Sequence, residues 1–232
     1  IPIPPDQAVW SHQIIQKSAN NGGVEVLLVA AAKTTIETYR QVLEQAGLEV
    51  LALETELMAV TRSVVDKNTP LLLVMDIGAK SSDIGLVSRG QLIFTRTVPT
   101  AGEAFTRSIE SSLGLDKTQA EQYKSTYGFT PGQLEGKLIE AMKPVLNTLV
   151  VEIRKTVDFY ISKHQGENIK AAVVTGGVAM MPEIVSMLSA NLGFEVIIGN
   201  PFANVSMDEL QRKSLSGSEV FYAAATGLSM RE

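Results

Sequence analysis

The stretch Asp76-Ile-Gly-Ala-Lys-Ser-Ser82 combines the residue types that hold a metal-bound phosphate. It follows the apolar run Leu71–Met75, which is typical of a buried strand. A glycine where a strand ends lets backbone N–H groups approach a ligand closely, and hydroxyls add donors for phosphate oxygens. A carboxylate beside phosphates suits Mg²⁺. The expected phosphate-site residues are Asp76, Gly78, Ser81 and Ser82, with Asp76 also the Mg²⁺ ligand. A plain hairpin turn uses the same residue types and is the alternative.

A second glycine-containing stretch, Thr175-Gly-Gly-Val-Ala179, lies between an expected strand and an expected helix. Backbone amides and the helix dipole favour an anion at such a place. The candidate binding residues are Gly176, Gly177 and Val178, and an ordinary strand-to-helix loop is the alternative. The chain contains neither a GxGxxG dinucleotide motif in this stretch nor a GxxxxGK[ST] phosphate loop.

Two further places carry charged side chains with suggestive spacing. Glu121 and Lys124 stand three residues apart in Ala120-Glu-Gln-Tyr-Lys124, which puts both on one face of a helix. Glu56 stands at the expected start of another helix. The alternatives are a solvated helix face for the first pair and an acid stabilised by the helix dipole for Glu56.

The elements that would position these residues follow from hydrophobic periodicity and turn signals. From residue 69 the chain predicts three strands, a helix, a helical region, a strand, a helix, a strand and a final helix. Their expected ranges are 70–77, 83–87, 91–98, 103–113, 116–164, 170–174, from 182, 195–198 and 218–230. Pro144 is expected to kink or break the helical region.

The first third of the chain repeats the end of that order. It predicts a strand at 24–30, a helix at 35–46, a strand at 49–53 and a helix at 56–66, and Trp10 is expected to anchor an earlier strand. Gly-Leu-Glu-Val at 47–50 also resembles Gly-Phe-Glu-Val at 193–196. We interpret this as duplication of one unit whose first copy lacks its opening, so the chain is expected to be an N-terminally truncated fragment.

The composition excludes several classes of protein. The 232 residues carry a net charge of −5 with a pI near 5.2, so no basic surface for nucleic acid is expected. The absence of cysteine excludes disulfides, thiolate metal sites and cysteine nucleophiles. No apolar run approaches the roughly 20 residues of a membrane-spanning helix.

Two glycine loops at strand ends of a duplicated unit resemble the actin/Hsp70/sugar-kinase superfamily. The resemblance implies an α/β chain with the actin-like ATPase fold, built of duplicated RNase H-like units that bind ATP and Mg²⁺ between them. Residues 1–68 would be the remainder of the first half, and 69–232 the second half with a helical insert at about 116–165. The resemblance makes Asp76-to-Ser82 the second phosphate loop and Gly176–Val178 the adenosine loop. It also implies that Glu121 and Lys124 contact the ribose and base and that Glu56 orients the attacking water.

Longer stretches resemble the PilM family, the actin-like, FtsA-related cytoplasmic proteins of type IV pilus assembly. They are Arg96–Lys124, Val173–Val205 and, within the latter, Asn200-Pro-Phe202. This resemblance implies a cytoplasmic scaffold, at most a slow ATPase, held at the inner membrane by the cytoplasmic tail of a PilN-like protein. Pilus assembly ATPases and the platform protein are further candidate partners.

Two other functions remain as alternatives. A small-molecule kinase of the same superfamily would need a catalytic acid near its cleft, and none stands out beyond the phosphate loop. The cytoplasmic part of a GspL-like secretion protein would usually continue into a membrane span.

Overall fold

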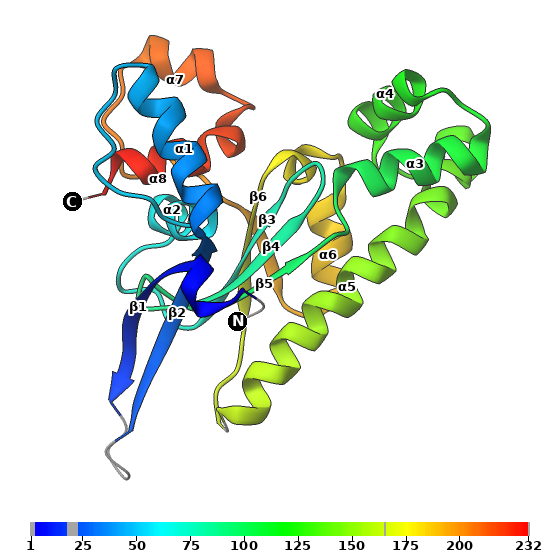
Figure 1. Cartoon of the computed structure of the whole chain (residues 1–232). Coiled ribbons are helices and arrows are strands. Elements are labelled where there is room, and N and C mark those ends of the chain that lie inside the picture. The colour runs from blue at the N-terminus through cyan, green and yellow to red at the C-terminus, as the bar shows by residue number, and fades with distance from the viewer. Residues whose placement is uncertain (1–2, 18–22, 165, 232) are drawn as a thin grey trace. The chain divides into compact units, whose positions relative to one another are not determined.

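The computed structural model describes residues 3–17, 23–164 and 166–231, which belong to two compact units, Ile1–Thr55 and Glu56–Glu232 (Figure 1). The division lies ahead of the helix that begins at Glu56, whereas the sequence interpretation placed it between residues 68 and 69. That helix belongs with the second unit because it packs against the strands and the last helix there.

The first unit contains an antiparallel strand pair followed by a helix. A 3₁₀ turn, η1 (Pro5–Gln7), precedes β1 (Ala8–Lys17), which pairs with β2 (Val24–Ala32), and α1 (Lys33–Gln45) follows. Two expectations are wrong here. Residues 49–53 form no strand, because no described neighbour pairs with that backbone. The Leu51 side chain in this segment is 86% exposed. Trp10 is also exposed, so it does not anchor a core.

A five-stranded mixed sheet forms the centre of the second unit. Its order is β5-β4-β3-β6-β7, made of β3 (Leu72–Ile77), β4 (Ser82–Ser88), β5 (Gln91–Val98), β6 (Ala171–Thr175) and β7 (Glu195–Ile198). The strands β3, β4 and β5 run antiparallel in succession, and β6 and β7 run parallel to β3. The apolar run in β3 is almost completely buried, as expected for a central strand covered on both faces.

Helices cover both faces of this sheet. In Figure 1, α2 (Glu56–Val64) and α8 (Ala223–Ser229) lie on one side, and α5 (Lys137–Lys163) and α6 (Ile184–Leu192) lie on the other. The remaining helices are α3 (Gly102–Leu113), α4 (Lys117–Tyr127) and α7 (Glu209–Leu215), with short 3₁₀ turns η2 (Gln133–Gly136), η3 (Gly177–Met180) and η4 (Glu219–Tyr222).

The helical region at 116–164 resolves into α4, η2 and α5. Asp116 caps α4 in a reciprocal capping box with Gln119. α5 continues through Pro144 without a break, and its buried residues recur along one face of the helix. They include Leu138, Met142, Leu149, Ile153 and Tyr160.

The crossing of α2 and α8 depends on small side chains. A Cβ atom on Gly227 of α8 would lie 1.7 Å from the backbone oxygen of Ala59 on α2. The Ser63 hydroxyl donates to the carbonyl oxygen of Ala223 at 2.8 Å, and the Arg62 guanidinium donates to that of Gly227 at 2.6 Å. Glycine therefore allows the two backbones to approach closely enough for these side-chain-to-backbone bonds.

We expect Gly227→Ala to lower the free energy of unfolding by about 3 kcal/mol or more, because the methyl group must displace the α2 backbone. Urea unfolding monitored by circular dichroism measures the change. Leu228→Ala, an exposed site on the same helix, is the matched control and should change stability by only about 0.5 kcal/mol. Equal stability of Gly227→Ala and the wild type would contradict the close crossing.

Candidate functional site

The pairing of β3 with its two neighbours brings polar side chains together at one edge of the sheet. Asp76 stands opposite Asp83 of β4 and beside Thr175 of β6. The Thr175 hydroxyl donates a hydrogen bond to Asp76 Oδ1 at 3.0 Å, and the Thr97 hydroxyl donates to Asp83 Oδ1. The carboxyl ends of the parallel strands β3 and β6 meet at this edge, where α/β proteins bind ligands.

Burial raises the pKa of Asp76 to about 6. The Thr175 hydrogen bond acts in the opposite direction, while the negative charges of Glu56 and Asp83 add to the increase. A desolvated carboxylate beside two other acids fits a site that gains a cation when it is filled. Within the described residues no three His, Asp or Glu side chains form a metal site by themselves, so Mg²⁺ here would need ligand oxygens such as those of phosphates.

The loop that follows Asp76 is fastened to the start of α3. Backbone N–H groups of Gly102 and Glu103 donate to the carbonyl oxygens of Gly78 and Ala79 at 3.0 and 2.8 Å. The Gly78 N–H donates to the Ser81 carbonyl at 3.1 Å. Ser82, an expected phosphate ligand, is fully buried, and its hydroxyl donates to the Thr100 carbonyl at 2.6 Å. Ser82 thus holds the connection between the sheet and α3.

The two glycines of the second stretch have different structural roles. Gly176 has φ +80°, and a Cβ atom there would lie 2.6 Å from both Asp76 Oδ1 and the Ile77 oxygen. Gly177 begins η3 with a Cβ position only 3.5 Å from Phe221 Cε1, an ordinary contact. Gly176 is therefore required by the fold itself, whereas Gly177 has room for a methyl group in the ligand-free protein.

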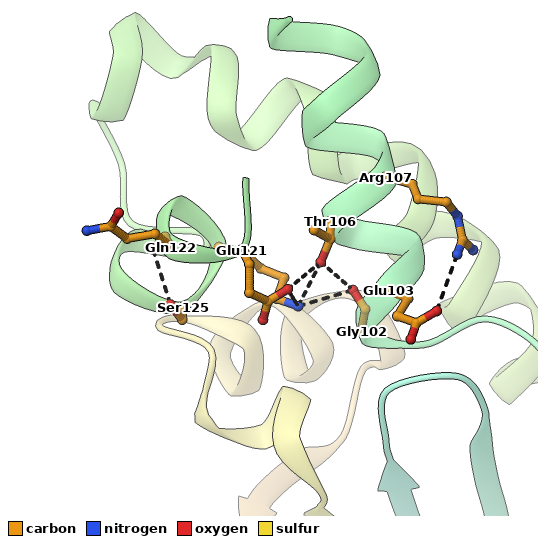
Figure 2. Close-up of polar contacts among 8 residues, drawn as sticks. Gly102, Glu103, Thr106, Arg107, Glu121, Gln122 and Ser125 are labelled. Atoms are coloured by element: carbon orange, nitrogen blue, oxygen red, sulfur yellow. Dashed lines mark hydrogen bonds and ion pairs between the residues drawn. The ribbon is translucent and has the colours of Figure 1, made fainter. Parts of the chain in front are cut away.

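Lys124 joins α4 to α3. Its ammonium group is nearly buried and donates to Glu121 Oε2 at 2.7 Å, to Thr106 Oγ1 at 2.9 Å and to the Gly102 carbonyl at 3.2 Å. Figure 2 shows Thr106, Glu121 and the start of α3 turned toward one another. Lys124 thereby fixes α4 against the α3 N-terminus.

Glu121 combines an engaged oxygen with an accessible one. Partial burial alone would raise its pKa, but hydrogen bonds from Lys124 and Thr106 lower the pKa below its usual value. The side chain stays about half exposed. An ionised acceptor is thus held in one orientation at the cavity wall.

These segments enclose a cavity of about 710 Å³ within the second unit. The predicted residues Gly78, Glu121, Lys124, Gly177 and Val178 line it. Asp76, Ser81, Ser82, Gly176 and Glu56 are outside its lining, although Glu56 is close enough to Asp76 to affect its pKa. The sequence interpretation missed Gly102, Thr106 and Phe221. Gly102 had a usable signal, because a glycine opening a helix permits close approach of another backbone.

No helix in the described ranges 3–17, 23–164 and 166–231 combines the length and apolar character needed to cross a membrane.

Comparisons with known proteins converge on one family. The model of the family "Type IV pilus assembly protein PilM" matches residues 1–232. A chain of the solved "PilM-PilN type IV pilus biogenesis complex" superposes with a TM-score of 0.82 and 26% identity, covering 100% of this chain and 68% of that chain. MreB 5 of Spiroplasma citri, solved with AMPPNP, gives a TM-score of 0.58 at 17% identity over 86% of this chain and 64% of its own. The expected actin-like fold is confirmed.

Cell division protein FtsA is a more distant relative in sequence. FtsA of Escherichia coli (strain K12) is 23% identical over 258 residues, 97% of this chain and 60% of FtsA. FtsA of Bacillus subtilis (strain 168) is 24% identical over 198 residues, 77% of this chain and 45% of FtsA. The chain thus spans about half the length of the curated relatives that it matches.

The raised pKa of Asp76 predicts how stability depends on pH. Between pH 3.8 and about 6 the folded protein binds more protons than the unfolded chain, so stability falls as pH rises through this window. Asp76→Asn should have a higher free energy of unfolding than wild type at pH 7.5. This advantage should be about 2–3 kcal/mol larger at pH 7.5 than at pH 4. Urea unfolding in EDTA measures both differences. Asp158→Asn on α5 removes the same charge elsewhere and serves as control. A difference independent of pH would contradict the assignment.

The two adjacent glycines should respond differently to one methyl group. Gly176→Ala should destabilise the protein by about 2–4 kcal/mol, because it combines a positive φ with a clash against Asp76. Gly177→Ala should stay within about 0.5 kcal/mol of wild type. Thermal unfolding of the two variants side by side measures this contrast, and similar losses at both positions would contradict it.

Proposed function

The chain belongs to the PilM family of type IV pilus assembly proteins, and on that basis we propose that it binds ATP with Mg²⁺ as an actin-like scaffold of the pilus machinery. The observation that carries the proposal is the cavity between the two glycine stretches, with the desolvated carboxylate of Asp76 at the adjoining sheet edge. The solved MreB 5 structures with AMPPNP and ADP support a nucleotide as the occupant.

Each part of the cavity has a distinct task in this proposal. The Gly78–Ala79 loop, which lines the cavity, would lie against the phosphates, since a glycine backbone allows their close approach. Asp76 would hold Mg²⁺, which would neutralise phosphate charge. Glu121 would accept from the ribose hydroxyls, because Lys124 and Thr106 keep its carboxylate ionised and oriented. Lys124 would position Glu121, since three hydrogen bonds hold the Lys124 ammonium group inside the protein.

Hydrolysis is expected to be slow. Glu56 at the start of α2 is our candidate for orienting a water, and the other acids at this edge are Asp76 and Asp83. Phosphoryl transfer depends on a complete, preorganised set of donors around the terminal phosphate. We therefore propose that nucleotide mainly stabilises the fold, as a ligand that binds only the folded state does.

A PilN-like protein is the proposed partner, because a PilM–PilN complex is among the similar structures. Its cytoplasmic tail would hold this chain at the inner membrane while the chain itself stays in the cytoplasm. Pilus assembly ATPases and the platform protein are further proposed partners.

The experiment that tests nucleotide binding compares full-length wild type with Asp76→Ala by titration calorimetry with Mg-ATP. Wild type should bind, and Asp76→Ala should bind about 10- to 100-fold more weakly, the loss of a charged partner costing about 1.5–3 kcal/mol. Phosphate release, measured on the same samples, should stay well below the roughly 1–100 s⁻¹ of kinases.

Asp158→Ala, which removes a carboxylate from α5 outside the cavity, is the matched control and should bind like wild type. A wild type that binds no Mg-ATP would refute the proposed function. Equal affinity of Asp76→Ala and wild type would remove Asp76 from the site, and kinase-like turnover would refute the scaffold role.

A further inference from the structure

One wall of the cavity is apolar and differs from the glycine-rich wall. Val178, Met180 and Met181 supply it from η3 and the residue after it, and Phe221 supplies it from η4. Val178 and Met181 are buried, whereas Phe221 is 61% exposed and Met180 is 39% exposed. Large apolar side chains that stay accessible inside a cavity are available for a ligand.

Phe221 is held in place without contributing to the core. Its neighbours Val220 and Ala223 are buried and anchor η4, and its N–H donates to the Ser218 carbonyl at 3.1 Å. The adjacent Tyr222 ring pairs with Phe202, with centroids 5.9 Å apart. Phe221 has no ring partner in the part of the chain that the structure describes. The backbone that carries the ring is therefore anchored, and the face of the ring is not used by another aromatic side chain of the described residues.

The ring also lies beside a backbone that has no side chain. Phe221 Cε1 is 3.5 Å from the Cβ position of Gly177, an ordinary van der Waals distance, so the edge of the ring borders the Gly177 backbone. A flat, apolar group stacked on the ring would therefore lie beside that backbone. Nucleobases have this shape, and their stacking on an aromatic side chain is worth about 1–3 kcal/mol per base.

The polar side chains that line the cavity come from other elements than the apolar wall. No asparagine or glutamine is among the described residues that line it. The polar and charged lining side chains belong to α3 and α4, and they are the Glu103–Arg107 and Glu121–Lys124 ion pairs together with Thr106, Glu110, Lys117 and Ser125. The face of a base would therefore meet η3 and η4, whereas its polar edge would meet α3 and α4.

We propose that Phe221 is the base platform of this site and that stacking on its ring selects purine over pyrimidine nucleotides. The inference rests on the proposed function, and it adds a specificity-determining residue to it. Mg-ATP and Mg-GTP should bind within about threefold of each other, and Mg-CTP more weakly, because a smaller base covers less of the ring.

The test uses the full-length protein and three substitutions of one residue. Phe221→Ala should weaken Mg-ATP binding about 5- to 150-fold, which is the stacking energy converted to affinity. Phe221→Trp should retain binding within twofold, and Phe221→Leu, which keeps apolar area without an aromatic face, should fall between them. Phe159→Ala removes a comparably exposed ring on α5 and should bind like wild type. Thermal unfolding without nucleotide verifies that each variant is folded.

A spectroscopic probe separates stacking from indirect effects on structure. The fluorescence of 2-aminopurine riboside triphosphate is quenched on stacking, so it should be quenched by wild type and by Phe221→Trp, and not by Phe221→Leu at saturation.

Three results would overturn the inference: Phe221→Ala binding Mg-ATP within twofold of wild type, equal losses in Phe221→Ala and Phe221→Trp, or quenching retained in Phe221→Leu. If Asp76→Ala loses binding while Phe221→Ala does not, the proposed function stands and only the base platform fails. If wild type binds no nucleotide, both fail.

Discussion

The parallel pairing of β3 with β6 is the interaction on which the candidate site depends. It brings Thr175 to Asp76 although the two residues are 99 positions apart, and it places the first glycine stretch beside the second. Gly176 can follow Thr175 at this point only because it has no side chain to meet Asp76. A shift of the pairing by one residue would move Asp76 to the other face of the sheet and separate it from Thr175 and Gly176.

Backbone hydrogen bonds carry this arrangement from the sheet to the helices. The carbonyl groups of Gly78 and Ala79 accept the first N–H groups of α3, which a helix start otherwise leaves without partners. Lys124 then ties α4 to the same helix start. The end of α4 also contacts the segment between η3 and α6. A Cβ atom on Gly128 would lie 2.4 Å from the Pro182 oxygen, and the Phe129 N–H donates to that oxygen. The walls of the cavity are thus connected through main-chain contacts and through the buried side chain of Lys124.

The same edge of the sheet shows a conflict between stability and binding. Burying Asp76 near Glu56 and Asp83 is unfavourable for the ligand-free protein, as its raised pKa shows. A cation would relieve that cost, so the carboxylate is suited to a filled site and poorly suited to an empty one. Elsewhere in the second unit the local sequence favours the observed structure, as in the capping boxes of α4 and α7. This stability allows one unfavourable buried group to persist.

Local patterns in the sequence determined the elements of the second unit and the position of both glycine stretches. The continuous apolar run of β3, the three-to-four spacing along α5 and the glycine that ends α3 each depend on neighbours within a few residues, so they were predictable. Motif resemblance indicated the family. The expected strand at 49–53 failed because a strand exists only where another backbone pairs with it.

Tertiary structure alone decided the chemical role of each site residue. It buried the Ser82 hydroxyl against Thr100, made Gly176 rather than Gly177 the glycine that the fold requires, turned Lys124 into a tether and placed Phe221 in the cavity. None of these roles follows from residue type or spacing. They depend on which groups from distant segments meet and on how much water remains around them, and strand register and helix packing set both.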